Sequence, residues 1–238
     1  MPYSFVKMEA EGVYKLVEMC EGKQLVNAEV DYDVKPSVKH LEFHNTCFLS
    51  DTELCNISDG LQNLERVCVS AFSVVTDAGY DSFFQNIKQL RTIYVADNRF
   101  TDATFESLAK HCSMLQKVFI GCHRPRLTDR VIEAFVKFKT PLVELTTLHN
   151  ERITSNAIEE LVMQCKTLKT LFYAGHLKLH TIETIALSSV DHLLTYKWSS
   201  NNNGNFVLPE QSKLRITWLD SSLVRKMNAQ INGDTFIE

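Results

Sequence analysis

One sequence pattern returns along most of this chain at a nearly constant distance. It has three apolar positions, Leu-x-x-Leu-x-Leu, in which another aliphatic or an aromatic residue can replace Leu. Successive copies start 26, 26, 25, 27, 26 and 25 residues apart, at Val38, Leu64, Leu90, Leu115, Leu142, Leu168 and Leu193. Chance does not hold a period this tightly over six intervals, so we predict a stack of similar units.

The second half of each unit repeats as well. An apolar residue and a short polar pair follow the pattern in five units, at Leu49-Ser50-Asp51, Val75-Thr76-Asp77, Phe100-Thr101-Asp102, Leu127-Thr128-Asp129 and Ile153-Thr154-Ser155. Apolar residues at helical spacing come next, as in Phe105, Leu108 and Cys112. Ser, Thr or Asp before such a run caps a helix by accepting hydrogen bonds from its free N–H groups. Each unit is therefore predicted to contain a strand, a turn, a capped helix and a second turn.

One strand and one helix cannot bury their apolar faces alone, so neighbouring units must stack and supply the missing wall. The strands then pair in parallel on one side and the helices line the other. Because strands pack more closely than helices, we expect the array to bend with its strands on the concave face. The predicted fold class is α/β.

Two units resemble a known family. The stretch from Leu90 to Cys112 is similar to the cysteine-containing leucine-rich repeat, and Leu142 to Cys165 is a second match. That subtype occurs in F-box substrate receptors of ubiquitin ligases and in related proteins without an F-box. The resemblance covers roughly residues 36–200 and implies a leucine-rich-repeat solenoid, or horseshoe. Cysteine fills the helical position in only two units, and the seventh unit breaks off at Asn201-Asn-Asn-Gly-Asn205.

The chain divides into three predicted parts: residues 1–35 as an N-terminal cap and lead-in, 36–200 as repeats, and 201–238 as a loop and C-terminal cap. Val13, Leu16, Val17 and Cys20 have the spacing of an amphipathic helix, which we expect to cap the first repeat. An F-box opens with Leu-Pro and is longer than this segment, and residues 1–35 show neither feature. Residues 214–219 alternate like a strand, residues 222–230 are expected to form a closing helix, and residues 232–238 are expected to fray.

Residues that suggest chemistry have a simpler explanation in this pattern. Asp51, Asp77, Asp102 and Asp129 stand just before helices and are interpreted as caps rather than catalytic carboxylates. Cys112 and Cys165 occupy matching apolar helix positions, which favours packing over nucleophilic catalysis. Three pairs, His44/Cys47, Cys122/His123 and His176/His180, lack the second pair that a structural zinc site needs. No phosphate-binding glycine motif occurs. We therefore expect no enzyme activity, no metal, no cofactor and no small-molecule substrate.

Composition and charge disfavour other classes of partner. The formal net charge is −4, so the basic surface that binds nucleic acid is not expected. No apolar run is long enough for a membrane span, and no secretory signal is visible at the N-terminus. The seven cysteines are odd in number and include no Cys-x-x-Cys pair, which favours reduced thiols. We expect an intracellular protein, in the cytoplasm or the nucleus.

Alternation along each strand predicts which side chains face the concave surface. One column reads Glu42, Cys68, Tyr94, Phe119, Thr146, Phe172 and Lys197, and the column two residues earlier includes Arg66, Lys117 and Glu144. We predict that Tyr94, Phe119 and Phe172 anchor a partner protein, with Cys68, Arg66, Lys117 and Glu144 around them. Alternatively, the aromatic residues only satisfy strand propensity, or the chain's own N- or C-terminal segment covers them.

Two functions fit this sequence. The first is a non-catalytic adaptor that binds a protein on the concave face, within a ubiquitin-ligase or another assembly. The second is a structural subunit of a larger complex, held by its edges and helices. RNA-linked or nucleotide-dependent binding is disfavoured by the acidic balance.

Overall fold

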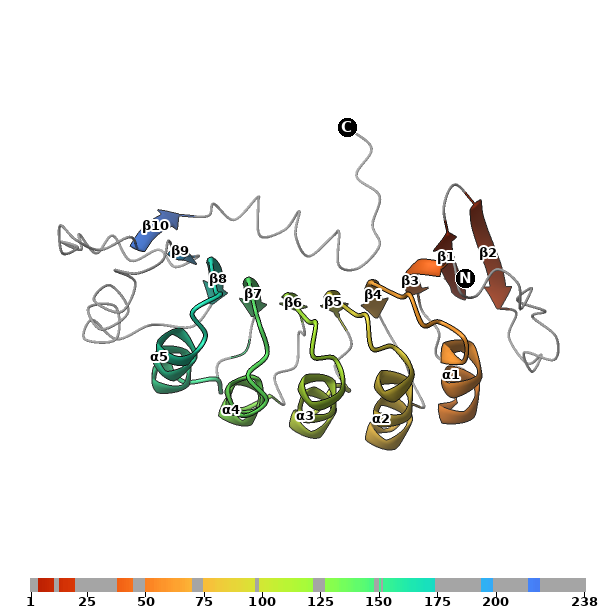
Figure 1. The fold of residues 1–238 in the computed structure, drawn as a ribbon, viewed down its shortest axis with the longest axis horizontal. Helices are drawn as coiled ribbons and strands as arrows, with labels where there is room; N and C mark the ends of the chain where they lie inside the picture. Colours follow the sequence, from red (N-terminus) through yellow and green to blue (C-terminus); the bar gives the residue numbers. More distant parts are fainter. Residues whose placement is uncertain are drawn as a thin grey trace.

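The computed structural model describes residues 4–10, 13–19, 38–44, 50–69, 75–96, 99–121, 127–147, 150, 152–173, 194–198 and 214–218. Within these residues, strands and helices alternate along the chain (Figure 1). All statements about the structure concern this part of the chain.

The strands form a single sheet of ten, in the order β10-β9-β8-β7-β6-β5-β4-β3-β1-β2. Their bounds are β1 Ser4–Ala10, β2 Val13–Met19, β3 Val38–His44, β4 Arg66–Val69, β5 Thr92–Val95, β6 Lys117–Ile120, β7 Glu144–Thr147, β8 Thr170–Tyr173, β9 Leu194–Trp198 and β10 Leu214–Trp218. Neighbours from β3 to β10 pair in parallel. The seven predicted strands are confirmed as β3–β9, and the alternating stretch near residue 214 is confirmed as β10.

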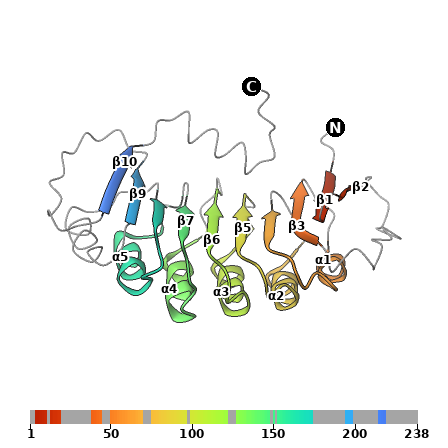
Figure 2. The ribbon, with the colours of Figure 1, turned by 45° about the horizontal axis from the view of Figure 1, so that its top comes forward.

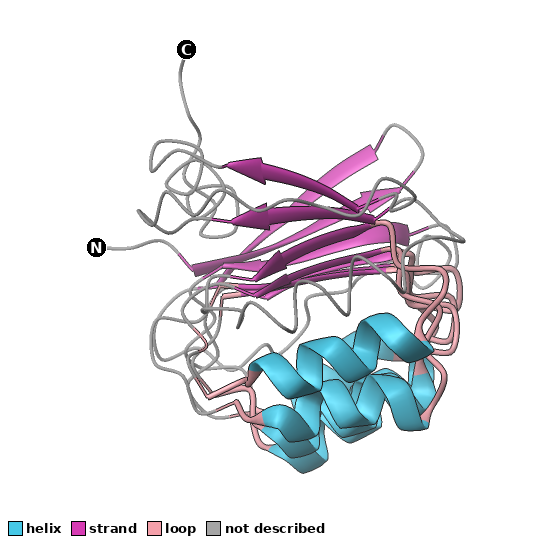
Figure 3. Cartoon of the chain, turned by 90° about the vertical axis from the view of Figure 1, so that its left-hand side faces the viewer, coloured by secondary structure: helices cyan, strands magenta, loops and turns pink. Residues whose placement is uncertain are grey.

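Five helices lie in a second layer, all against one face of the sheet (Figures 1 and 3). They are α1 Asp51–Ser58, α2 Asp77–Asn86, α3 Asp102–His111, α4 Asp129–Lys137 and α5 Ser155–Gln164. Each of the helices α1 to α4 packs against the helix of the next unit. Parallel strands in one layer and helices in the other fit the arrangement of leucine-rich repeats, so the α/β class is confirmed.

The pattern residues build the core between the two layers. In the third unit Leu90, just before β5, and Ile93 and Val95 within it are fully buried. Leu115, just before β6, and Val118 and Ile120 within it repeat this in the fourth unit. Helical side chains such as Phe105 and Phe135 belong to the same core as these strand residues. The ring centroids of Phe105 and Phe135 lie 6.3 Å apart. Because the pattern residues face the helices, the residues between them face the opposite side of the sheet, which we call the open face.

The helix caps differ in one respect from the prediction. The N-cap is the Ser or Thr before the first helical residue: Ser50, Thr76, Thr101, Thr128 and Thr154. Asp51, Asp77, Asp102 and Asp129 occupy the first helical position instead, where a negative charge is stabilised by the helix dipole. They accept hydrogen bonds from the cap of the next unit, as in Thr128 to Asp102 and Thr154 to Asp129. The carboxylates therefore have a structural role in joining adjacent repeats.

The predicted N-terminal helix is wrong, because Val13–Met19 forms strand β2. It pairs antiparallel with β1, and β1 in turn pairs antiparallel with β3 (Figure 2). The apolar residues Val13, Leu16 and Val17 fit helical spacing, but β-branched valines and Tyr14 also favour a strand once a partner strand is present. The hairpin still covers the first repeat, by extending the sheet at its β3 edge.

Some predicted features lie outside the described residues. These are the loop at residues 201–205, the closing helix at 222–230 and the terminal residues 232–238. Cys47, Cys122, His123, His176 and His180 lie outside them too, so the paired-ligand arguments built on those residues stay predictions.

Candidate functional site

The central column of the open face has the predicted register. Cys68 aligns with Tyr94, and Tyr94 with Phe119. Thr146 and Phe172 continue the row, which begins at Glu42 and ends at Lys197. The neighbouring row places Arg66, Lys117 and Glu144 in adjacent strands in the same way. The register thus brings the seven predicted site residues onto one face of the sheet.

Tyr94 and Phe119 form the most distinctive feature of this face. Their rings stack with centroids 4.4 Å apart and an interplanar angle of 7°. Both side chains are partly exposed, whereas most large aromatic residues of the described chain are buried in the core. Burial raises the pKa of the Tyr94 hydroxyl above its ordinary value of 10; the Arg66 charge opposes this rise and Glu144 adds to it. The pair offers a flat apolar surface with one hydrogen-bonding hydroxyl.

Charged side chains lie in the row beside this pair and at the β3 end of the face. The Lys117 Nζ lies 3.4 Å from Glu144 Oε2, and Arg66 is exposed. At the β3 end, His40 Nε2 lies 3.2 Å from Glu42 Oε1. A central aromatic cluster with charged neighbours is the usual anatomy of a protein-binding patch.

Two of the predicted site residues are not accessible. Phe172 is 1% exposed and Cys68 is 7% exposed. Neither can contact a partner while it is buried in this way. Burial, with a smaller contribution from the Glu42 charge, raises the pKa of the Cys68 thiol to about 12, so this thiol stays protonated. The accessible aromatic surface therefore reduces to Tyr94 and Phe119.

The repeat cysteines pack as predicted from their positions. Cys112 and Cys165 are both buried, each directly after its helix. The Cys112 thiol points to the Ile87 carbonyl oxygen at 3.8 Å, and the Cys165 thiol to the Leu142 carbonyl oxygen at 3.5 Å. The Cys165 thiol also lies 3.6 Å from the Thr140 carbonyl oxygen, so each thiol contacts the backbone of the preceding unit. Burial raises the pKa of Cys112 to about 12, which disfavours the nucleophilic thiolate.

A cluster that the sequence did not indicate joins α2 and α3. Asp81 Oδ1 accepts a hydrogen bond from Ser107 Oγ at 2.5 Å and lies 3.1 Å from His111 Nε2. Because Ser107 donates to the aspartate, and not to the histidine, its hydroxyl is not activated as a nucleophile would be. Its only sequence signal is the one-repeat spacing between Asp81 and Ser107, and the cluster joins two neighbouring helices.

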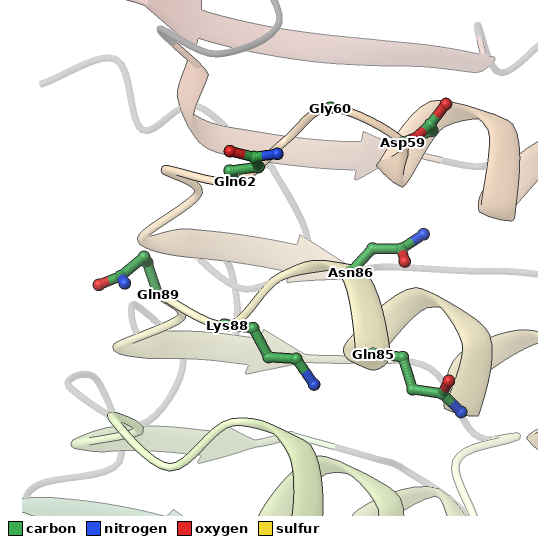
Figure 4. A pocket seen from close by; sticks show the side chains of 7 residues that line it. All are labelled: Asp59, Gly60, Gln62, Gln85, Asn86, Lys88 and Gln89. Carbon is green, nitrogen blue, oxygen red and sulfur yellow. The ribbon is translucent and has the colours of Figure 1, made fainter.

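A polar hollow of about 400 Å³ lies where α1 and α2 end (Figure 4). It is lined by Asp59, Gly60, Gln62, Gln85, Asn86, Lys88 and Gln89. These side chains come from two successive units and do not converge on one point (Figure 4). Asn86 already donates to the Ser58 hydroxyl at 2.8 Å. The hollow has neither the apolar lining nor the convergent polar groups of a typical ligand site.

The described residues contain no group of three or more His, Cys, Asp or Glu side chains that could hold a metal ion. None of the helices in this part of the chain has the length and hydropathy of a membrane span.

Comparison with known proteins does not assign the chain to a family. No family model matches the sequence, and no curated protein matches it closely enough to count as a relative. A solved structure described as "Crystal structure of Rad7 and Elc1 complex in yeast" aligns over 78% of this chain and 77% of that chain, with 13% identity and a TM-score of 0.29. A superposition this loose says nothing about what this chain binds. The chain's own sheet and repeats therefore carry the functional argument.

Proposed function

We propose that this chain is a non-catalytic protein-interaction module whose open face binds a partner protein through Tyr94 and Phe119. The stacked and partly exposed ring pair is the observation that supports this function. Large aromatic side chains bury much apolar area at a low cost in conformational entropy, so they are frequent anchors at interfaces.

The neighbouring charges suit a polar rim around such an anchor. Arg66 and the Lys117–Glu144 pair lie in the row beside the two rings. Rim charges contribute to the rate and specificity of association more than to affinity. We propose that Arg66 and Lys117 contact carboxylates of the partner.

The finer parts of the proposal rest on the sequence resemblance. We propose that the array is a horseshoe of the cysteine-containing subtype, with the open face on its concave side. A role as a substrate-receptor-like subunit of a ubiquitin ligase is the narrowest form of this function. A structural subunit of a larger complex, without a receptor role, is the alternative, and the long helical layer supports it by offering a second surface.

We also propose that the chain carries out no reaction. Two observations on the described residues favour this: the Cys68 and Cys112 thiols are held protonated, and the Ser107 hydroxyl donates to Asp81. Neither arrangement supplies an activated nucleophile.

Hydroxyl-radical footprinting of the full chain, alone and in its purified cellular complex, separates these alternatives. For an adaptor, oxidation of Tyr94 and Phe119 falls on complex formation, while Met163 on α5, which is 44% exposed, is oxidised as before. Protection of Met163 and the helical layer, with Tyr94 and Phe119 unchanged, would instead support the structural subunit. The proteins recovered in the complex decide whether ligase components are present.

A further inference from the structure

A second surface lies at the edge of the array where each helix ends and the next strand begins. Short connections lead from α2 to β5, α3 to β6, α4 to β7 and α5 to β8, through residues 87–91, 112–116, 138–143 and 165–169. Strands β5 to β8 pair in parallel, and α2 to α5 pack in the same order in one row (Figure 1). The four connections therefore follow one another along one edge, which we call the helix-end edge.

The helix-end edge carries charge of one sign. From the last turn of each helix to the residue before the next strand, the ranges are 83–91, 108–116, 134–143 and 161–169, and they contain no aspartate or glutamate. Six lysines in these ranges are exposed: Lys88, Lys110, Lys137, Lys139, Lys166 and Lys169. The whole chain has 29 acidic and 25 basic residues, so this edge departs strongly from the average composition.

Stabilisation of the helix ends explains only part of this charge. A cation in the last turn interacts favourably with the helix dipole, and Lys110 and Lys137 stand there. Lys88, Lys139 and Lys166 each come after the C-cap of their helix, where this effect has faded. Among the described residues, Lys137 is the only one of the six lysines with a carboxylate at ion-pair distance. The other lysines are therefore free to meet carboxylates of another molecule.

The backbone of Lys139 gives an independent indication. Its φ of 52° lies in the left-handed region. A side chain costs free energy in that region, and helices that end in this way usually have glycine there. Lysine occupies the position despite the cost, and its side chain is exposed. Such an outlier indicates that the charged side chain itself has a role.

The chemistry of the helix-end edge favours a partner with carboxylates over one with phosphates. Phosphate groups commonly bind at helix N-termini, where free N–H groups point at them, whereas helix C-termini present carbonyl groups. The four ranges contain no tyrosine or tryptophan, and their phenylalanines are buried or partly buried. They thus offer no exposed aromatic ring of these types on which a nucleic-acid base could stack. Acidic side chains need neither feature to pair with lysines.

The spacing of the units sets the length of such a partner. Packed helices lie about 8–10 Å apart, so the row from α2 to α5 spans about 24–30 Å. An extended chain advances about 3.3–3.6 Å per residue, and about eight residues therefore cover the row. Toward α1 the row ends at the polar hollow, where Asp59 has the opposite charge (Figure 4).

We propose that the helix-end edge binds an extended acidic segment of a partner protein, with its carboxylates against the lysines at the ends of α2 to α5. This edge is distinct from the open face that carries Tyr94 and Phe119. The inference therefore holds whether or not the open face binds a partner.

Fluorescence anisotropy with a labelled peptide of about eight glutamates tests the proposal on the full chain. The triple variant Lys88→Glu, Lys139→Glu and Lys166→Glu reverses the charge after three of the four helices. Its Kd for the peptide should rise more than about tenfold, because favourable ion pairs become like-charge contacts. Undetectable binding to the natural sequence, or an unchanged Kd in the triple variant, would overturn the proposal.

The matched control reverses three exposed arginines near the starts of α3, α4 and α5. Arg99→Glu, Arg130→Glu and Arg152→Glu change the net charge by the same amount at the opposite ends of the helices. Because salt screens distant charges, the Kd of this control should rise less than about threefold. An equal loss in both variants would mean that the peptide responds to net charge alone, and the helix-end edge would not be its site.

Two further measurements separate the remaining explanations. Lys139→Gly removes one charge and relieves the backbone, so thermal stability should not fall while the Kd rises about two- to threefold. Peptide binding as tight as that of the natural sequence would contradict the role of Lys139. A DNA duplex of equal charge that binds more tightly than the peptide, and loses affinity in the lysine variant, would overturn the choice of an acidic polypeptide.

The proposed partner site on the open face is tested separately from this one. Tyr94→Ala with Phe119→Ala should leave the Kd of the glutamate peptide unchanged. A loss of peptide binding in that folded variant would place the peptide on the open face and overturn the assignment to the helix-end edge. Circular dichroism shows that each variant is folded before it is titrated.

Discussion

Asp102, the first residue of α3, accepts two hydrogen bonds from Thr128, the N-cap of α4. The Thr128 amide nitrogen lies 2.9 Å from Oδ1 and its hydroxyl 2.7 Å from Oδ2. The same contact joins Asp51 to Thr76 and Asp129 to Thr154. Asp77 accepts from the Thr101 hydroxyl at 2.9 Å, and from Thr104 as well. A row of carboxylates along the helix starts thus connects each unit to the next.

Replacing Asp102 by Ala should lower the free energy of unfolding by about 1–3 kcal/mol, because two partly buried donors on Thr128 lose their acceptor. Asp102→Asn keeps one oxygen acceptor, so its loss should be smaller. Urea denaturation measures both values. The exposed Glu133→Ala on α4 is the control and should change stability by no more than about 0.5 kcal/mol. Equal stability of Asp102→Ala and the control would contradict the bridging role.

Replacement of Gly79 in α2 by Ala should change stability in the direction opposite to the usual one for a helix. Gly→Ala inside a helix normally stabilises by about 1 kcal/mol. Here a Cβ on residue 79 would collide with the Asp51 carboxylate, which is held by Thr76. Gly79→Ala should therefore destabilise the protein in urea unfolding, and should become stabilising in the Asp51→Ala background. A stabilising Gly79→Ala in the natural sequence would show that Asp51 moves aside without cost.

The Asp81 cluster predicts a pH dependence of stability. The hydrogen bond from Ser107 is the largest cause that lowers the pKa of Asp81 below its ordinary 3.8, followed by the hydrogen bond from Gln85 and the charge of His111. Between the lowered folded pKa and 3.8 the unfolded chain binds more protons than the folded chain. The contribution of Asp81 is therefore complete above pH 3.8 and is lost as pH falls through the folded value.

Urea unfolding of the natural sequence and of Asp81→Asn between pH 2 and pH 7 measures this contribution. The stability difference between the two proteins should be constant from neutral pH to about pH 4 and should shrink below it. A difference that does not change on acidification would mean that Asp81 is not stabilised as a carboxylate.

The thiols report on the burial of the open face. Because burial raises the pKa of Cys68 and of Cys112 to about 12, iodoacetamide at pH 8 should label both far more slowly in the native protein than in denaturant. The partly exposed Cys55 on α1 serves as the internal reference. Peptide mass spectrometry gives the rate at each site. Native labelling of Cys68 as fast as Cys55 would show that the β4 end of the face is open.

The period of the repeat was enough to predict the strands and their register. The repeat length placed Tyr94 beside Phe119, and parallel pairing makes this register exact from Glu42 to Lys197. The alternation of buried and open positions also followed from strand geometry. These features depend only on contacts that every unit repeats.

Features that depend on contacts between units or with the chain ends were missed. The sequence predicted that the aspartates at the helix starts are N-caps. Their role as acceptors for the N-cap Thr of the next unit is visible only once the neighbouring helix is in place. The residues Val13, Leu16 and Val17 fitted a helix, and only pairing with β1 decides for a strand. Phe172 was predicted to be accessible because its column says nothing about what lies above the sheet.

The most direct test of the proposed function is partner affinity of the full chain with Tyr94→Ala and Phe119→Ala together. Binding of the purified cellular partner is measured by isothermal titration, after circular dichroism shows that the double variant is folded. The proposal predicts a loss of more than 2 kcal/mol, roughly thirtyfold in Kd, as for other aromatic anchors. Met163→Ala on α5 should bind as the natural sequence does. Equal affinity of the folded double variant and the natural sequence would contradict binding through the open face.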